Sequence, residues 1–293
     1  MNNQAAGIQH IVDRYLRSEA SISMIVMELL QRTEDTSALG RILPTLNGEP
    51  AKLRALAQHL ADNEAGCRTI VGMLRQRLDS PELAGDAEEG IERCRRLFDA
   101  SVAQSEESSV ALYSLGNPEL LAAATDEVIG VMDDWGVLAP DRDALELGCG
   151  IGRLMAPLSS RLRSVTGTDV SPGMIAAATR RLTGLSNAAV LLTSGKDLAS
   201  FASASVDLVY SVDTFPYLVL SGQALVERHF EEVRRVLRPR GDFVLFNYAY
   251  GRSREEVNGE VLGLAHRAQL QVIRADESPF HVWNGIGWLL RKA

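Results

Sequence analysis

One stretch of the chain decides its fold: Glu146-Leu147-Gly148-Cys149-Gly150-Ile151-Gly152-Arg153. It follows a short apolar run at residues 144–147 and opens an amphipathic segment at residues 152–162, so it predicts a strand, a tight loop and a helix. Glycine has no Cβ, so a glycine-rich loop turns sharply and lets backbone N–H groups approach a ligand at the start of a helix. The stretch therefore predicts a binding site at the carboxyl end of a strand.

The spacing of the glycines favours an adenosyl ligand over a dinucleotide. The glycines run G-x-G-x-G, whereas the dinucleotide fingerprint is G-x-G-x-x-G. Glu146 precedes the first glycine by two positions, where a carboxylate would repel a pyrophosphate. Asp169 closes the next predicted strand, 17 residues after Gly152, where an acid can accept hydrogen bonds from both ribose hydroxyls. A nicotinamide-dependent oxidoreductase is therefore disfavoured.

Short β-branched runs alternate with amphipathic stretches from about residue 108 onward. Strands are predicted at residues 144–147, 164–169, 189–192, 206–212, 242–248, 270–273 and 283–290. Helices are predicted between them at residues 152–162, 172–182, 223–237 and 255–268. This alternation predicts an α/β fold, a Rossmann-like, doubly wound, seven-stranded sheet with helices on both faces. The last two strands lack an intervening helix, which predicts an antiparallel hairpin at the sheet edge.

The first hundred residues show helical periodicity and almost no strand signal. Ile8, Ile11, Val12 and Leu16 follow one apolar helix face, and a later helix is predicted to end at residues 79–81. The polar segment 101–109 is interpreted as a boundary. We therefore expect an all-α N-terminal domain at residues 1–105 and an α/β domain at residues 106–293. The helical domain is expected to cap the acceptor site or to form a homodimer interface.

The composition is that of a soluble globular protein, with 293 residues, 46% hydrophobic and 23% charged. A net charge of −8 argues against a nucleic-acid partner, because binding phosphates needs a basic face. The three cysteines lie far apart, which favours neither a disulfide scaffold nor a zinc site, so no metal is expected. The N-terminus lacks the pattern of a signal peptide, and the apolar stretch at residues 22–30 is too short to span a bilayer. We expect a cytoplasmic protein without a membrane partner.

From about Tyr113 to the C-terminus, the chain resembles the class I S-adenosylmethionine-dependent methyltransferases of the small-molecule type. The similarity lies in the glycine stretch and in four further segments, at residues 168–174, 195–198, 206–211 and 237–242. These match the second-strand acid, the adenine-contacting loop, the fourth strand and the turn before the fifth strand, with Arg240 where glycine is more usual. The resemblance implies an enzyme, a transferase that uses S-adenosyl-L-methionine and releases S-adenosyl-L-homocysteine.

The resemblance also implies a cofactor site at the strand ends. Its expected members are Tyr113, Glu146, Gly148, Cys149, Gly150, Gly152, Asp169, Val170, Met174, Lys196, Asp197, Leu198, Ser211 and Val212. The cofactor is net positive, which suits Glu146, Asp169 and Asp197. Tyr113 is expected to close over the methionine end of the cofactor with its ring or its hydroxyl, or else to anchor its segment against the core. Asp197 is expected to contact adenine or to be a solvated loop acid.

The acceptor is expected beyond the carboxyl ends of the strands, where ligands of such sheets bind. The candidate catalytic residues there are Tyr217, Tyr248 and His281, of which Tyr217 stands where relatives often have a histidine. His281 can replace that histidine as a base, because imidazole titrates near neutral pH. Residues 213–217 differ from the [D/N]PP[Y/F] signature of enzymes that methylate amide or adenine nitrogens, and no Pro-Cys nucleophile occurs. The prediction is O-, N- or C-methylation of a metabolite or natural-product intermediate, a role in small-molecule biosynthesis.

A second interpretation has no catalysis at all. The chain then binds S-adenosylmethionine through the same fold, and its helical region mediates contact with a partner protein. It is favoured by the missing histidine and by the large helical N-terminal region. Binding of S-adenosylmethionine without methyl transfer would distinguish it from the enzyme.

Overall fold

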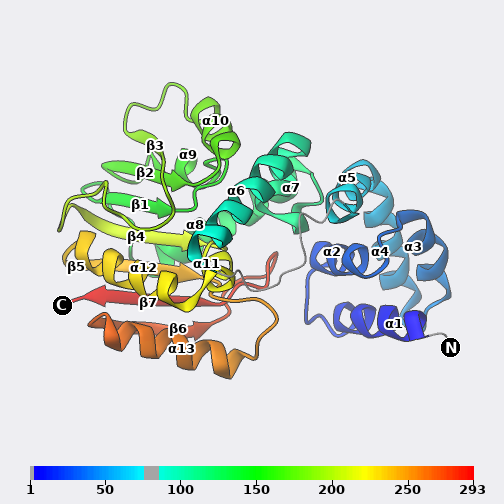
Figure 1. The fold of residues 1–293 in the computed structure, drawn as a ribbon. Helices are drawn as coiled ribbons and strands as arrows, with labels where there is room; N and C mark the ends of the chain where they lie inside the picture. The colour runs from blue at the N-terminus through cyan, green and yellow to red at the C-terminus, as the bar shows by residue number, and fades with distance from the viewer. Residues whose placement is uncertain (1–2, 76–85) are drawn as a thin grey trace. The chain divides into compact units, whose positions relative to one another are not determined.

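The computed structural model describes residues 3–75 and 86–293. These residues belong to two compact units (Figure 1), and each is described separately below. The first unit takes its described residues from the ranges 1–77, 101–128 and 280–284, and the second from 78–100, 129–279 and 285–293. The division of the chain into domains at residues 105 and 106 stays a prediction.

The first unit is helical, as the periodicity predicts. It contains α1 (Asn3–Leu16), α2 (Ile22–Thr33), α3 (Thr36–Ile42), η1 (Leu43–Thr45), α4 (Pro50–Asp62), α5 (Glu64–Arg75), α7 (Glu106–Val110) and η2 (Leu112–Ser114). Side-chain caps start three of these helices, because Ser21 accepts from Met24 N, Asp35 from Ala38 N and Ser105 from Ser108 N. Ile8 and Val12 of the predicted apolar face are fully buried in the core of this unit. The helix end predicted at residues 79–81 lies outside the described residues.

The second unit contains a seven-stranded sheet of order β3-β2-β1-β4-β5-β7-β6. Its strands are β1 (Asp143–Leu147), β2 (Ser164–Asp169), β3 (Ala188–Leu192), β4 (Val206–Val212), β5 (Leu237–Phe246), β6 (Leu270–Glu277) and β7 (Gly287–Lys292). Strands β1 to β5 pair in parallel, and β7 is antiparallel to both β5 and β6. The predicted fold class and the antiparallel pair at the edge are confirmed.

The helices beside this sheet are α6 (Ala87–Gln104), α8 (Pro118–Asp134), α9 (Met155–Leu158), α10 (Pro172–Arg181), α11 (Phe215–Ser221), α12 (Gln223–Val236) and α13 (Arg254–Arg267), of which α6 and α8 each contribute residues to both units. Helices α10, α12 and α13 follow the amphipathic segments predicted at residues 172–182, 223–237 and 255–268. Helix α12 packs on β5 and α13 packs on β6, so they cover the part of the sheet that contains the antiparallel pair (Figure 1). Helix α10 packs on β2 and β3.

Two local predictions were wrong. The helix expected at residues 152–162 is only α9, because the Ser159 and Ser160 hydroxyls donate to Ala156 O and Pro157 O and compete with a longer helix. The segment expected as the turn before the fifth strand already belongs to β5, which begins at Leu237 opposite Val206 and then shifts register. The polar segment 101–109, interpreted as a boundary, contains the end of α6 at Gln104 and helix α7, which Ser105 caps, and one division between the two units falls at its start, between residues 100 and 101.

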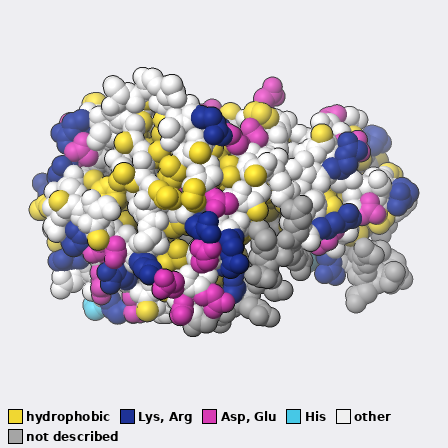
Figure 2. Space-filling model, turned by 45° about the horizontal axis from the view of Figure 1, so that its top comes forward, with side chains coloured by type: hydrophobic (Ala, Val, Ile, Leu, Met, Phe, Trp, Pro, Cys, Tyr) yellow, Lys and Arg dark blue, Asp and Glu magenta, His cyan; other side chains and the backbone are white. Residues whose placement is uncertain are grey.

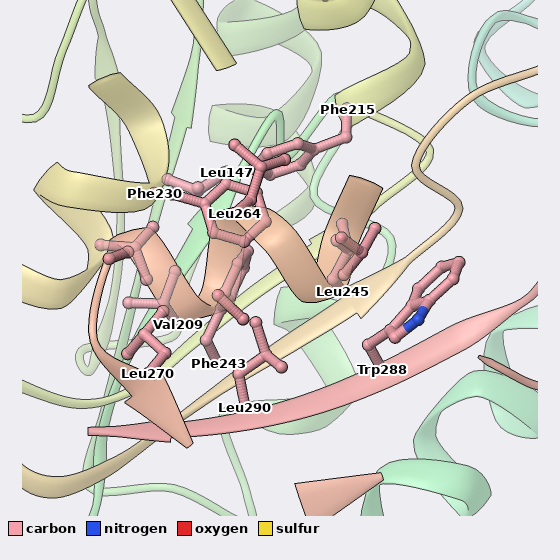
Figure 3. Close-up of a cluster of buried hydrophobic side chains, with 14 of the residues drawn as sticks. Leu147, Val209, Phe215, Phe230, Phe243, Leu245, Leu264, Leu270, Trp288 and Leu290 are labelled. Carbon is pink, nitrogen blue, oxygen red and sulfur yellow. The ribbon is translucent and has the colours of Figure 1, made fainter. Parts of the chain in front are cut away.

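The core of the second unit lies between the sheet and helices α12 and α13 (Figure 3). Phe215 and Phe230 meet edge to face at 5.5 Å, and Phe230 meets Phe243 in the same way at 5.6 Å. The buried Trp288 indole donates from Nε1 to Asn258 Oδ1 at 3.0 Å, so its one polar atom has a partner. This core fixes the positions of β4 and β5, whose carboxyl ends form part of the site.

Candidate active site

The glycine loop after β1 adopts a backbone conformation that suits glycine. Gly148, Gly150 and Gly152 have φ angles of 67°, 53° and 71°, in the left-handed region. A Cβ built at Gly148 would lie 2.1 Å from Oγ1 of Thr214, the second residue after β4. Thr214 Oγ1 in turn donates to Leu147 O at 2.9 Å. The loop therefore packs directly against the carboxyl end of β4, and no larger residue fits at position 148.

Asp169 ends β2 with its carboxylate directed at the same loop. Its Oδ2 accepts from Gly150 N at 3.0 Å, and its Oδ1 accepts from Ser171 N at 2.9 Å. Burial raises the pKa of Asp169, and the hydrogen bonds from these backbone N–H groups oppose the rise. A carboxylate offers about four lone-pair positions. Asp169 can therefore accept further hydrogen bonds from a ligand.

Glu146 is a buried carboxyl at the end of β1. Its exposed fraction is 3%, and its Oε2 accepts from the Tyr210 hydroxyl at 2.9 Å. Desolvation raises the pKa of Glu146 to about 8, and the Asp169 carboxylate adds to the rise while the Arg153 guanidinium opposes it. At neutral pH the Glu146 carboxyl is therefore largely protonated. A cation bound nearby would favour its ionised form.

Helix α6 supplies a carboxylate that the sequence analysis missed. Asp99 Oδ1 accepts from Ser171 Oγ at 2.6 Å and from Gly173 N at 2.9 Å. Arg95 holds the other oxygen of Asp99 from the same helix, at 3.1 Å. These contacts attach α6 to the start of α10, directly after Asp169. The apolar spacing at residues 91, 94 and 98 predicts a helix here, but no local signal identifies its partner.

The loop after β3 holds three of the predicted cofactor residues. Lys196 forms an ion pair with Glu88 of α6 at 3.2 Å. Asp197 accepts from Ala199 N and from Arg228 of α12, and the first of these bonds contributes most to lowering its pKa. Leu198 is buried, and its backbone N–H donates to Glu232 at 3.1 Å. Because the Asp197 carboxylate is already paired, the backbone of this loop fits an adenine contact better than that side chain does.

The remaining predicted cofactor residues of this unit line the strand ends. Cys149 and Met174 are buried, and a Cβ built at Gly195 would lie 2.6 Å from Val170 Cγ1. The pKa of the Cys149 thiol is raised by burial, so it stays protonated. Ser211 is fully buried, and its hydroxyl has no hydrogen-bond partner among the described residues. Val212 is half-buried at the end of β4.

Of the candidate catalytic residues, Tyr217 and Tyr248 belong to the second unit and His281 belongs to the first. Tyr217 lies beside α6, with its ring edge-on to Phe98 at 4.9 Å. Tyr248 is buried in the core and stacks on Phe215 at 6.3 Å, so packing accounts for its position. His281 belongs to the first unit, where its backbone N–H donates to Glu127.

Tyr113 also belongs to the first unit. It is buried, with its ring stacked on Trp283 at 6.3 Å. This contact agrees with the interpretation of Tyr113 as an anchor for its segment. The roles expected of Tyr113 and His281 at the cofactor and the acceptor stay predictions.

The topology and the glycine loop define a Rossmann-like ligand-binding domain with an antiparallel strand pair at one edge. Residues 145–245 match the family model described as "Methyltransferase domain". The Schizosaccharomyces pombe protein "Uncharacterized methyltransferase C70.08c" is 34% identical over 122 residues, which cover 41% of this chain and 45% of the relative. Residues 145–245 are therefore similar to a methyltransferase domain, and the chain matches less than half the length of that relative.

Two solved structures share the fold at low identity. Phosphoethanolamine N-methyltransferase 1 of Haemonchus contortus, in complex with phosphoethanolamine and S-adenosylhomocysteine, has a TM-score of 0.53 at 16% identity, covering 70% of this chain and 49% of its own. The [4+2]-cyclase SpnF has a TM-score of 0.53 at 16% identity, covering 73% of this chain and 99% of its own. At such identities the likeness concerns the fold alone, and that fold is the class I methyltransferase fold the sequence predicts.

Proposed function

We propose that this protein is an S-adenosylmethionine-dependent methyltransferase with a small-molecule acceptor. The observation that carries the proposal is the arrangement of Asp169 and the glycine loop. Asp169 is held by Gly150 N and Ser171 N, with lone pairs left for two ribose hydroxyls. Gly148 packs so closely on Thr214 that the loop has no room for a side chain at this position.

The residues present fit this cofactor better than a dinucleotide. S-adenosylmethionine carries a sulfonium and an ammonium against one carboxylate, so its net charge is positive. The Asp169 and Asp99 carboxylates lie at or beside the loop and would repel a pyrophosphate, whereas a bound cation would favour the ionised form of Glu146. In this proposal Asp169 holds the ribose, Glu146 faces the methionine end, and Val170, Met174 and Leu198 surround the adenine. When bound, the cofactor supplies an electrophilic methyl group, and the chain's own residues align the acceptor with it.

A small acceptor suits the surface as well as the sequence. The net charge is −8, and basic and acidic side chains lie interspersed on the face drawn in Figure 2. Recognition of a nucleic acid would call for clustered basic residues. No helix among the described residues is long and apolar enough to cross a membrane. The reaction at oxygen, nitrogen or carbon, a place in small-molecule biosynthesis, a cytoplasmic location and a homodimer remain part of the proposal.

The second candidate is a protein that binds the cofactor without transferring its methyl group. The fold alone does not decide between the two, since the structural neighbour SpnF is titled a cyclase. Calorimetric titration of the full chain with S-adenosylmethionine, S-adenosylhomocysteine and NAD tests the proposal. Binding of the first two but not of NAD supports it, and preference for NAD contradicts it. Formation of S-adenosylhomocysteine with a panel of small acceptors then separates the enzyme from the non-catalytic protein.

A further inference from the structure

Two polar residues directly after β4 and β5 share an unusual backbone conformation. Asp213 and Asn247 both have a φ angle of 59°, in the left-handed region that few non-glycine residues adopt. The strands end in register, with Val212 opposite Phe246, so the two residues are neighbours at the carboxyl edge of the sheet. Such conformations concentrate at functional sites, where the surrounding structure holds them.

Hydrogen bonds fix the orientation of the Asp213 carboxylate. Asn247 Oδ1 accepts from Ile286 N at 3.0 Å, so its Nδ2 is the atom that faces Asp213 and donates to Oδ1 at 2.7 Å. The Tyr250 hydroxyl donates to the same Oδ1 at 2.5 Å. No donor among the described residues reaches Asp213 Oδ2. The carboxylate is therefore held through one oxygen, and its other oxygen is available to a ligand.

Three aromatic rings form a series of contacts that begins at this carboxylate. The Tyr217 ring meets the Tyr250 ring edge to face, with 6.5 Å between centroids, and it meets the Phe98 ring of α6 edge-on at 4.9 Å. Tyr250 is 54% exposed, which is unusual for a large aromatic side chain. Ring faces carry negative potential and attract a cation, most strongly when a carboxylate lies nearby. Burial raises the pKa of Asp213, whereas the bonds from Tyr250 and Asn247 and the positive charge of Arg153 oppose the rise, as a bound cation would.

The cluster lies next to the glycine loop. Thr214 follows Asp213 in the chain, and its side chain packs on Gly148 and bonds Leu147 O. A ligand on Asp213 Oδ2 would therefore lie beside the loop to which we assign the methyl donor. Neither Asp213 nor Tyr250 is among the catalytic residues that the sequence predicts.

We propose that Asp213, Tyr217, Tyr250 and Phe98 form the subsite for a cationic amine, so that the acceptor is an amine. This rests on the proposed function, and it names the substrate class of that site. Asp213 Oδ2 binds the ammonium and accepts one of its protons, while the rings accommodate its alkyl substituents. The freed lone pair on nitrogen would then form the N–C bond to the methyl group of S-adenosylmethionine as the C–S bond breaks, with S-adenosylhomocysteine as the leaving group. A neutral hydroxyl acceptor would gain little from this combination of rings and carboxylate.

Calorimetry with two matched probes tests the subsite. Choline carries a quaternary ammonium, and 3,3-dimethylbutan-1-ol has the same shape without the charge. Each is titrated into the full chain, with and without saturating S-adenosylhomocysteine. We expect choline to bind at least about tenfold more tightly than the alcohol, and the preference to fall below about threefold in Asp213→Asn and in Tyr217→Leu. Asp141→Asn, on an exposed loop, is the matched control and should keep the full preference.

The outcomes separate this inference from the proposed function. Equal binding of the two probes, absence of binding, or an unchanged preference in a folded Asp213→Asn variant overturns the amine subsite, even when S-adenosylhomocysteine binds normally. Failure of the wild-type chain to bind S-adenosylhomocysteine, with a choline preference that Asp213→Asn removes, keeps the subsite and contradicts the methyltransferase. Far-ultraviolet circular dichroism and thermal unfolding of each variant establish that it is folded.

Discussion

The Asp99 carboxylate of α6 accepts a hydrogen bond from the Ser171 hydroxyl at 2.6 Å, across 72 positions of sequence. The same Ser171 oxygen accepts from Met174 N at 3.0 Å and caps α10. Asp169, two residues earlier, faces the glycine loop. One short segment after β2 thus links the glycine loop, the start of α10 and a helix from the N-terminal third of the chain. The position of α6 is therefore coupled to the proposed ribose site.

Replacing Asp99 with Ala should loosen α6 and weaken cofactor binding. The substitution leaves Ser171 Oγ and Gly173 N without their acceptor, and each such bond contributes about 0.5–1.5 kcal/mol. We expect the free energy of unfolding to fall by about 1–3 kcal/mol and S-adenosylhomocysteine to dissociate faster. Urea unfolding and stopped-flow dissociation measure the two effects. Asp99→Asn keeps an acceptor oxygen and should lose less; equal losses in both variants would contradict the hydrogen-bond explanation.

Replacing Asp169 with Ala should weaken cofactor binding by two or more orders of magnitude. The proposed ribose bonds are charge-assisted and contribute about 1.5–3 kcal/mol each. Calorimetry with S-adenosylhomocysteine gives the change in affinity. Asp133→Ala, which removes an exposed carboxylate paired with Arg161, serves as control and should bind normally. Unchanged affinity in a folded Asp169→Ala protein would remove Asp169 from the cofactor site.

The local pattern of β-branched and polar residues in the sequence was sufficient to predict most of the sheet. The strands at residues 164–169 and 206–212 have the predicted bounds, because β-branched runs between glycine and polar residues carry their own signal. The start of β5 was missed, since Pro239 and Arg240 indicate a turn and only the pairing with β4 extends the strand back to Leu237. The shortened α9 was missed for a similar reason, because serine hydroxyls there compete for backbone carbonyls.

The part of the site built from neighbouring strands was predictable, and the part built from distant contacts was not. Parallel strands end at the same sheet edge, so Asp169 after β2 was expected to lie near the loop after β1. Nothing local indicates that Asp99 bonds Ser171 or that Asn247 orients Asp213. Tyr248 is the opposite case. Its position after β5 predicts a site residue, but its ring is buried against Phe215. Which way a side chain points depends on the pairing of the whole sheet.

The buried Glu146 should make stability fall as pH rises. Its pKa is raised to about 8 in the folded protein, from 4.5, so between these values the native state binds more protons than the unfolded chain. The contribution of protonated Glu146 to the free energy of unfolding is complete below about pH 4.5, decreases as pH rises, and is lost above about pH 8. Urea unfolding of wild type and Glu146→Gln between pH 5 and 9 measures it. Wild type should lose stability relative to Glu146→Gln as pH rises from 5 to about 8, because glutamine keeps an acceptor for Tyr210 without titrating; a difference independent of pH would contradict the raised pKa.

The glycine loop allows a matched test of close packing against backbone strain. Gly148 and Gly136 have nearly equal φ angles, 67° and 69°, but a Cβ at Gly148 would lie 2.1 Å from Thr214 Oγ1, whereas nothing lies within 4 Å of one at Gly136. Both alanine variants carry the left-handed cost of about 1–2 kcal/mol, so Gly136→Ala measures strain alone. Gly148→Ala must in addition displace Thr214, which breaks the hydrogen bond from Thr214 to Leu147 O.

We expect Gly136→Ala to lower the free energy of unfolding by about 1–2 kcal/mol and to bind S-adenosylhomocysteine normally. Gly148→Ala should lose more stability and at least about tenfold in affinity, since the loop must move by a large fraction of an ångström. Equal stability and equal affinity of the two variants would show that the loop tolerates a side chain at position 148 and that the cofactor does not depend on its close approach to β4.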